Sequence, residues 1–451
     1  MTVEWGWFPD HADELTRLTL DHLATAVPAV LLGLLIALPL AVLAHRVRTL
    51  RGFLLGASNI LYTIPSLAFF VLLLPVTGLT RTTAIVGLTA YTLVVLVRNT
   101  VEGLDAVPVK AREASKAMGT RPLRTLLTVE LPLALPVIMA GVRVATVMSI
   151  SLVSVASYIG YGGLGQLFTD GFQRNFPTPV VAGVLLTLLL ALVADALLVT
   201  VQWLCTPGGA AAPPGRPPSS CGSERDPTML ELLKNLASWL TSSAQWSGPE
   251  GIATRVLEHL EYSVLATLAA AVIALPIGLL IGHTGRGAFL AVNLSSFGRA
   301  LPTVGLVTLV FLAGGLSVWP VYVSLVALAV PVIITNTYAG MAAVDPEVKD
   351  AAKGVGLRGH QILWQVELPL ALPLIMTGVR LATVQVVATA TIAAYVSFGG
   401  LGRYVFDGLA QRDLVQVLGG AALVAVLAVL ADLALGGLTR LLFRGRPATA
   451  R

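Results

Sequence analysis

The stretch VELPLALPVIMAGVRVATV at residues 129–147 decides the fold, because it returns almost unchanged as VELPLALPLIMTGVRLATV at residues 366–384. Sixteen of these nineteen positions are identical, at an offset of 237 residues. The same offset holds without a gap over most of each half and pairs His22 with His259. Self-similarity at one fixed period is the signature of a repeated structural unit. The sequence therefore predicts two homologous units.

The composition predicts that both units lie in a membrane. Of the 451 residues, 56% are hydrophobic and 12% are charged, whereas a soluble domain carries about 25% charged residues. This excludes an ordinary soluble enzyme, a disordered chain and a secreted disulfide scaffold. In a membrane protein, basic residues mainly report orientation, so the net charge of +5 predicts no nucleic-acid partner. The two cysteines have no metal-ligand spacing, and we expect neither a metal site nor catalytic residues.

Apolar runs long enough to cross a bilayer occur five times in each half. We expect an all-α polytopic protein with about ten spans, arranged as a first domain (1–205), a Pro/Gly/Ala/Ser linker (206–228) and a second domain (229–451). The expected spans lie near residues 23–44, 53–75, 82–98, 133–158, 178–204, 260–282, 289–313, 318–335, 370–395 and 415–441.

Basic residues gather on one side of these predicted spans, at the first loop, the third loop and the C-terminal end of each half. The positive-inside rule makes this side cytoplasmic in both halves. Five spans is an odd number, so the first half ends inside although the second must begin outside. Two alternatives stay open: Met229 begins a separate polypeptide, or the linker crosses by another route. An inverted five-plus-five repeat would resolve the count but would place the basic third loop of the second half outside.

The third loop of each half carries the same short pattern. It reads Glu113-Ala114-Ser115, then Gly119 and Leu131-Pro132 in the first half, and Asp350-Ala351-Ala352, then Gly356 and Leu368-Pro369 in the second. Small residues allow close approach to a partner, and a glycine can end a short helix by adopting positive φ. Glu113 with Lys116, and Asp350 with Lys353, are spaced to pair on a helix surface. One copy would read as an ordinary surface helix, but two copies at fixed spacing favour a partner-binding loop.

At these residues the chain resembles the permease subunits of binding-protein-dependent ABC importers, whose loop carries an "EAA" motif. Within them it is most similar to the osmoprotectant permeases, which import glycine betaine, choline, carnitine or proline betaine. That closer resemblance rests on four stretches: His259-Leu260-Glu261-Tyr262, Ile281-Gly282-His283-Thr284, Arg299-Ala300-Leu301-Pro302-Thr303 and Tyr158-Ile159-Gly160-Tyr161-Gly162-Gly163-Leu164-Gly165.

The resemblance implies a permease of the bacterial plasma membrane in which the two halves pair as a pseudo-heterodimer. It implies two copies of a separate ATPase subunit and an extracytoplasmic substrate-binding protein. The sequence contains no G-x-x-x-x-G-K-[S/T] phosphate loop, so we expect no ATPase site and no cofactor in this chain, with ATP used by the partner. A secondary transporter with inverted repeats, or an importer permease for another small solute, are the alternatives.

Four charges fall at matched positions inside the predicted spans of the two halves. Arg143 and Arg380 lie in the fourth span, and Asp195 and Asp432 in the fifth; at 1.5 Å per residue, all lie roughly 13–16 Å from the cytoplasmic side. A charge within a membrane is costly and usually paired or functional. We expect the pairs Arg143–Asp195 and Arg380–Asp432. Separate exposure to a water-filled cavity, or an aspartate that binds a cationic substrate, are the alternatives.

A glycine-rich turn follows the fourth span of each half on the outer side. Glycine permits tight backbone packing, so we expect this turn to contribute to an outer gate, with a purely structural turn as the alternative. The adjoining tyrosines could line the translocation path or simply pack. The residues concerned are Tyr158, Gly162, Gly163 and Gly165, and Tyr395, Gly399, Gly400 and Gly402.

Overall fold

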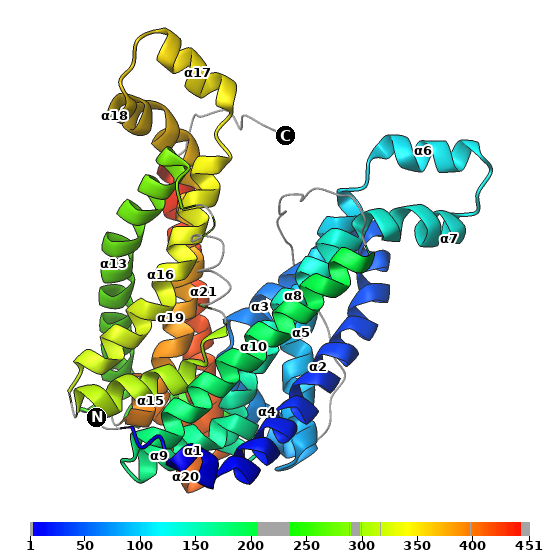
Figure 1. Cartoon of the computed structure of the whole chain (residues 1–451). Coiled ribbons are helices and arrows are strands. Elements are labelled where there is room, and N and C mark those ends of the chain that lie inside the picture. The colour runs from blue at the N-terminus through cyan, green and yellow to red at the C-terminus, as the bar shows by residue number, and fades with distance from the viewer. Residues whose placement is uncertain are drawn as a thin grey trace. The chain divides into compact units, whose positions relative to one another are not determined.

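The computed structural model describes residues 3–205, 235–287, 300–315, 317–396 and 398–442, together with residues 289 and 298. Within these residues every regular element is a helix (Figure 1). The chain divides into two compact units, Met1–Leu230 with Arg299–Gly305, and Glu231–Gly298 with Leu306–Arg451. The expected linker 206–228 lies outside the described residues.

Four long helices build the first unit. They pack in the order α2, α5, α8, α10, and α2 also contacts α8. Shorter helices lie before and between them. The long helices are α2 (Ala12–Arg46), α5 (Arg81–Asp105), α8 (Leu131–Val153) and α10 (Pro177–Cys205), and the shorter ones are α1 (Trp7–Asp10), α3 (Arg48–Thr63), α4 (Ser66–Thr77), α6 (Val109–Ala117), α7 (Pro122–Thr125) and α9 (Gln166–Gln173).

The second unit repeats this order, with α13 on α16, α16 on α19 and α19 on α21. Its long helices are α13 (Ile252–Thr284), α16 (Trp319–Ala342), α19 (Leu368–Ala390) and α21 (Leu414–Leu442), and its shorter ones are α12 (Ser243–Trp246), α15 (Thr303–Gly314), α17 (Pro346–Gly354), α18 (Gly359–Ile362) and α20 (Gly402–Gln411).

The second predicted span of each half differs from expectation. Eight described helices are long and apolar enough to cross a membrane, and α4 and α15 are shorter apolar helices. In the first unit the predicted span 53–75 is broken into α3 and α4, because Ile64 and Pro65 are extended, with ψ of 129° and 133°. A residue before proline is pushed out of the helical region. In the second half, most of residues 289–302 lie outside the described residues.

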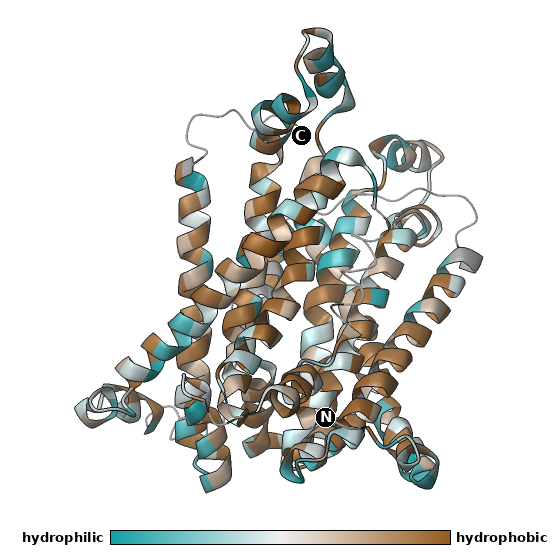
Figure 2. Ribbon diagram, turned by 60° about the vertical axis from the view of Figure 1, so that its left-hand side comes forward, coloured by the Kyte–Doolittle hydropathy of each residue, from teal (hydrophilic) through white to brown (hydrophobic). Residues whose placement is uncertain are grey.

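Large apolar side chains point outward from the long helices. Leu31 and Leu35 of α2 and Leu189 and Leu197 of α10 are all exposed. The hydropathy colouring of Figure 2 shows long helices that are apolar around most of their circumference. A helix that is hydrophobic all round belongs in a large core or in a membrane. Together with the eight candidate spans, this makes the chain a polytopic membrane protein.

The third long helix of each unit begins with a widened turn. Residues Leu126–Glu130 and Leu363–Glu367 form one π-helical turn, directly before α8 and α19. Pro132 and Pro369 occupy the first turn of those helices, where a missing N–H does little harm. The Leu-Pro pair of the loop pattern therefore starts the long helix instead of lying in the loop. Single π turns inside α-helices are rare and are frequently found at functional sites.

Small residues bring the middle helices of each unit together. A Cβ added to Gly141 of α8 would lie 2.5 Å from Cβ of Asn99 on α5, and one added to Gly378 of α19 would collide with Cβ of Asn336 on α16 in the same way. No larger residue fits at either glycine without movement of the facing helix. Close approach through small residues is the usual way that helices pack in a membrane.

A buried histidine ties the first long helix to the third in both units. Nε2 of His22 lies 2.8 Å from the carbonyl oxygen of Ile150, and Nε2 of His259 lies 2.8 Å from that of Val387. A carbonyl oxygen only accepts, so Nε2 is the donor in each bond.

The intramembrane charges meet as two pairs. Arg143 Nε lies 2.8 Å from Asp195 Oδ1, and a second guanidinium nitrogen lies 2.9 Å from Oδ2. Arg380 Nε lies 3.0 Å from Asp432 Oδ1, and its Nη2 lies 2.7 Å from Oδ2. Both are two-pronged contacts, which fix the angle of the side chains as well as their distance. Each pair joins the third long helix to the last one, α8 to α10 and α19 to α21.

Breaking one of these pairs is expected to destabilise its unit. Asp195→Asn leaves Arg143 without its counter-charge among apolar helices, at a cost of about 3 kcal/mol on insertion scales. We expect a lower temperature of aggregation in detergent for Asp195→Asn and for Arg143→Gln, measured by size-exclusion chromatography after heating. The double reversal Arg143→Asp with Asp195→Arg should recover part of the loss. A reversal no more stable than either single change would contradict the pairing.

Candidate coupling site

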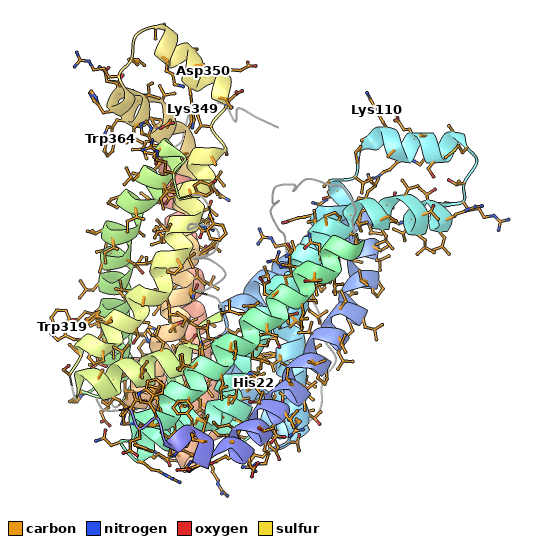
Figure 3. All side chains as sticks on the ribbon, viewed as in Figure 1. His22, Lys110, Trp319, Lys349, Asp350 and Trp364 are labelled. Carbon is orange, nitrogen blue, oxygen red and sulfur yellow. The ribbon has the colours of Figure 1, made fainter. Side chains whose placement is uncertain are left out.

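Two short helices stand apart from the long ones, α6 in the first unit and α17 in the second. Figure 1 shows each projecting from one end of its own unit, beyond the ends of the long helices. Each follows an extended residue, Pro108 before α6 and Asp345 before α17. Asp345 also caps α17, since its carboxylate accepts a hydrogen bond of 2.9 Å from the backbone N–H of Glu347. Figure 3 shows Lys110 extending away from the first unit on the outer surface of α6.

A glycine ends each of these two helices, as the sequence predicts. Gly119 has φ of +72° and Gly356 has φ of +87°. In α6 the N–H of Gly119 donates to Lys116 and that of Thr120 to Ser115; in α17 the equivalent bonds run from Gly356 to Lys353 and from Leu357 to Ala352. This double bonding is a Schellman motif, which favours glycine at the left-handed position. The expectation of positive φ at these glycines is confirmed.

The small-residue pattern has one face toward solvent and one toward the protein. Glu113 and Ala114 are exposed and Ser115 is buried; in the same way Asp350 and Ala351 are exposed and Ala352 is buried. The acidic residue and the first alanine of each pattern are thus available to a partner, whereas the third residue packs beneath the helix. The substitution of serine for alanine in the first half therefore falls on the buried side.

The residues packed around Ser115 in the first half are polar, whereas their counterparts in the second half are apolar. Oγ of Ser115 lies 2.6 Å from Oγ1 of Thr120 and 3.0 Å from Oγ1 of Thr125, and the two threonine hydroxyls are 2.8 Å apart. The equivalent residues in the second half are Ala352, Leu357 and Ile362. One loop is therefore stabilised by a hydroxyl cluster and the other by apolar contact, in the same geometry.

The expected ion pair on each helix surface forms in one half. Lys353 Nζ lies 2.8 Å from Asp350 Oδ1, with both side chains exposed. The hydrogen bond that Lys353 donates to Asp350, together with the charge of that carboxylate, raises the pKa of the Lys353 amine above its ordinary value. Among the ion pairs of the described residues there is none between Glu113 and Lys116, so that half of the prediction is wrong. An exposed pair contributes little to stability, and Glu113 stays available for another contact.

Exposed apolar side chains surround the two helices at matched positions. Met118 is 74% exposed and its counterpart Val355 is 80% exposed, each at the C-terminal end of its helix. Leu127 and its counterpart Trp364 are also exposed, on the π turns; Figure 3 labels Trp364 beside α18. Apolar side chains gathered on an otherwise polar projection are typical of a protein-binding surface.

Four glycines of the predicted outer turns, Gly162, Gly163, Gly165 and Gly402, lie where a side chain would collide with backbone. A Cβ on Gly163 would lie 2.7 Å from Cα of His22, one on Gly165 would lie 2.5 Å from the carbonyl oxygen of Ser154, and one on Gly402 would collide with that of Thr391. The backbone N–H of Gly400 donates to Glu258 across 2.7 Å. Tyr158 and Tyr395 lie in the short 3-10 helices that precede these turns. This explains the glycines by packing, and their part in a gate stays a prediction.

Two acidic residues next to α6 and α17, the two helices that we call the coupling helices, are not predicted by the sequence patterns. Glu130 and Glu367 are buried at the ends of the π turns. Glu130 pairs with Arg112 and Glu367 with Lys349, and both cations lie on the coupling helices. The signal was present, since a lone acid interrupts the apolar runs of residues 129–147 and 366–384 at the same position of each repeat.

Comparison with known proteins follows the same division of the chain. The family model of binding-protein-dependent transport system inner membrane components matches residues 29–202 and again residues 274–445. Each match contains one coupling helix and one intramembrane charge pair. A secondary transporter with inverted repeats is thereby excluded.

Three similar proteins each match less than half of the chain and nearly all of their own length. The osmoprotectant import permease protein OsmW of Salmonella typhimurium is 40% identical over 205 residues, which is 44% of this chain and 95% of that protein. The choline transport system permease protein of Bacillus subtilis is 37% identical over 196 residues, 44% of this chain and 90% of that protein. The carnitine transport permease protein of Listeria monocytogenes is 33% identical over 201 residues, 45% and 92% respectively. With two family matches that cover most of its length, the chain belongs to the inner membrane components of binding-protein-dependent transport systems, and its sequence contains two such components.

Proposed function

We propose that this chain supplies both permeases of an ABC importer for osmoprotectants such as glycine betaine, choline, carnitine or proline betaine. The paired coupling helices carry the proposal: two matched projections have the same glycine stop, the same exposed acidic position and the same exposed apolar tip. The names of the similar permeases, which refer to osmoprotectant, choline and carnitine transport, support the substrate class.

The energy source in this proposal is a separate ATPase subunit, present in two copies, because the chain has no phosphate-binding loop. One ATPase receives α6 and the other α17. Closure of the ATPases on ATP moves the two helices, and the long helices that follow them switch between inward-facing and outward-facing states. An extracytoplasmic binding protein delivers the solute. The differences between the hydroxyl cluster under α6 and the apolar cluster under α17 lead us to expect two ATPase contacts that are similar but not identical.

The domain boundaries of the proposal are residues 1–205, 206–228 and 229–451, with the middle range as linker. Because the linker is polar and joins ends that the charge distribution places on opposite membrane faces, we propose that Met229 begins a second polypeptide in the working complex. N-terminal sequencing and intact mass of the protein from membranes test this. A single species of 47.1 kDa would contradict it.

Transport should depend on ATP and on both partners. In proteoliposomes that contain this chain, its ATPase and its binding protein, we expect labelled choline or glycine betaine to accumulate only with ATP. Uptake driven by an ion gradient without the ATPase would contradict the importer mechanism. Accumulation of methionine or an oxyanion, with no uptake of quaternary amines, would leave the mechanism intact and overturn the substrate class.

Docking of the ATPase should depend on the exposed tips of the coupling helices. We expect Met118→Asp and Val355→Asp each to weaken ATPase binding about tenfold, since a charge replaces an apolar contact at the proposed interface. The affinity is measured by biolayer interferometry with the chain in nanodiscs. Leu79→Asp is the matched control, because Leu79 is also apolar and well exposed but lies at the opposite end of α5 from α6. Equal binding by Val355→Asp and Leu79→Asp would contradict docking through α17.

A further inference from the structure

A buried carboxylate joins the second coupling helix to the long helix that follows it. Glu367 is 2% exposed and ends the π turn in front of α19. Its Oε1 lies 2.9 Å from Nζ of Lys349 on α17, and its Oε2 lies 2.5 Å from Nδ1 of His283 near the end of α13. Lys349 also donates to the carbonyl oxygen of Met341 at the end of α16, across 3.3 Å. One carboxylate therefore connects the coupling helix to two long helices, and its lysine reaches a third.

The first unit repeats this contact in a weaker form. Glu130 is 9% exposed, and its Oε1 lies 3.6 Å from Nε of Arg112 on α6. Arg112 also donates to the carbonyl oxygen of Leu104 near the end of α5. The position that His283 occupies in the second half is Arg46 in the first, and that side chain donates to the carbonyl oxygen of Pro122 instead. We call these two groups, Arg112 with Glu130 and Lys349 with Glu367 and His283, the carboxylate latches.

Burial makes each latch a mechanical constraint. A buried carboxylate without its cation carries the full cost of desolvation, and removal of one member of a buried pair is strongly destabilising. The coupling helix therefore cannot rotate away from the start of α8 or α19 unless the carboxylate becomes exposed to solvent or loses its cation. The carboxylate of each latch lies at the end of the π turn, directly before α8 or α19.

The two halves use their remaining charges differently. In the first unit Asp105, at the end of α5, lies 2.8 Å from Nδ1 of His45 on α2 and 2.6 Å from Nη2 of Arg51 on α3. The equivalent second-half residues are Ala342, Gly282 and Ala288, which have no charge. Near α6, two of the first unit's ion pairs join the ends of long helices to each other or to α3, whereas near α17 the pairs of the second unit all involve α17 or its partner Glu367.

We propose that Glu130 and Glu367 are positioning residues that transmit movement of the coupling helices to α8 and α19, and that the second half is the more tightly coupled. The proposal rests on the proposed function for its role in transport, but the latch itself is a property of this chain alone. Each carboxylate acts through the cation of its coupling helix and touches neither solute nor ATP.

The first experiment measures the latch without any partner. A nitroxide on a cysteine at Val355, in a chain whose Cys205 and Cys221 are serine, reports the motion of the end of α17 in nanodiscs by electron paramagnetic resonance. We expect greater mobility in Glu367→Gln and in Lys349→Met, and mobility near that of the parent chain in Lys349→Arg. Asp170→Asn, an exposed acid on the outer side, is the matched control. Unchanged mobility in Glu367→Gln overturns the latch.

The second experiment measures coupling in the reconstituted importer. We expect solute moved per ATP hydrolysed to fall about tenfold in Glu367→Gln, a typical size for loss of an internal coupling contact, and to fall less in Glu130→Gln. ATP hydrolysis should stay near that of the parent chain, and Lys349→Arg should restore coupling where Lys349→Met loses it. An unchanged ratio in Glu367→Gln, or an equal loss in both halves, overturns the proposal. A parent chain that does not transport overturns the proposed function instead, and the mobility measurement then decides the latch.

Discussion

A charge among apolar helices needs an opposite charge within reach, and this requirement organises both units. A charge inside a membrane-spanning helix is costly unless an opposite charge or water compensates it. Arg143 with Asp195 and Arg380 with Asp432 meet the requirement with two-pronged contacts. Each pair joins two helices that are distant in sequence, and so it sets how the third long helix faces the last. The buried histidines also join the third long helix of each unit to the first, and the glycines let it pack closely against the second.

At the ends of the long helices next to α6 and α17 the same requirement appears with a different outcome. There the charges lie on short helices as well as long ones, so a pair can connect a projecting element to the bundle. Glu367 pairs with Lys349 of α17 and with His283 of α13, whereas Asp105 pairs with residues of α2 and α3. Two units of the same fold thus distribute their ion pairs differently around their coupling helices. In the proposed importer each half contacts its own copy of the ATPase, which leaves the two halves free to diverge.

The glycines show how local backbone geometry supports this arrangement. Gly119 and Gly356 adopt positive φ at the ends of the coupling helices, and there the left-handed conformation is what matters. Gly141 and Gly378 have ordinary helical backbones and are required for a different reason, the closeness of Asn99 and Asn336 on the neighbouring helix. The first kind of glycine can be recognised from its place after a short helix. The second becomes evident only when the facing helix is known.

The repeat, the apolar runs and the spaced charges by themselves determine much of this protein. They are sufficient for two all-helical membrane units, for the glycine-ended coupling helices, and for the expectation that Arg143 meets Asp195, because helical rise places both at one depth. The tertiary structure decides what depends on neighbours. It places the break at Ile64 and Pro65 inside a predicted span, and it brings Glu130 and Glu367 to the cations of the coupling helices. Periodicity reports which face of a helix is apolar, but the partner of a buried carboxylate depends on which other helix end lies beside it, and only the packed bundle determines that.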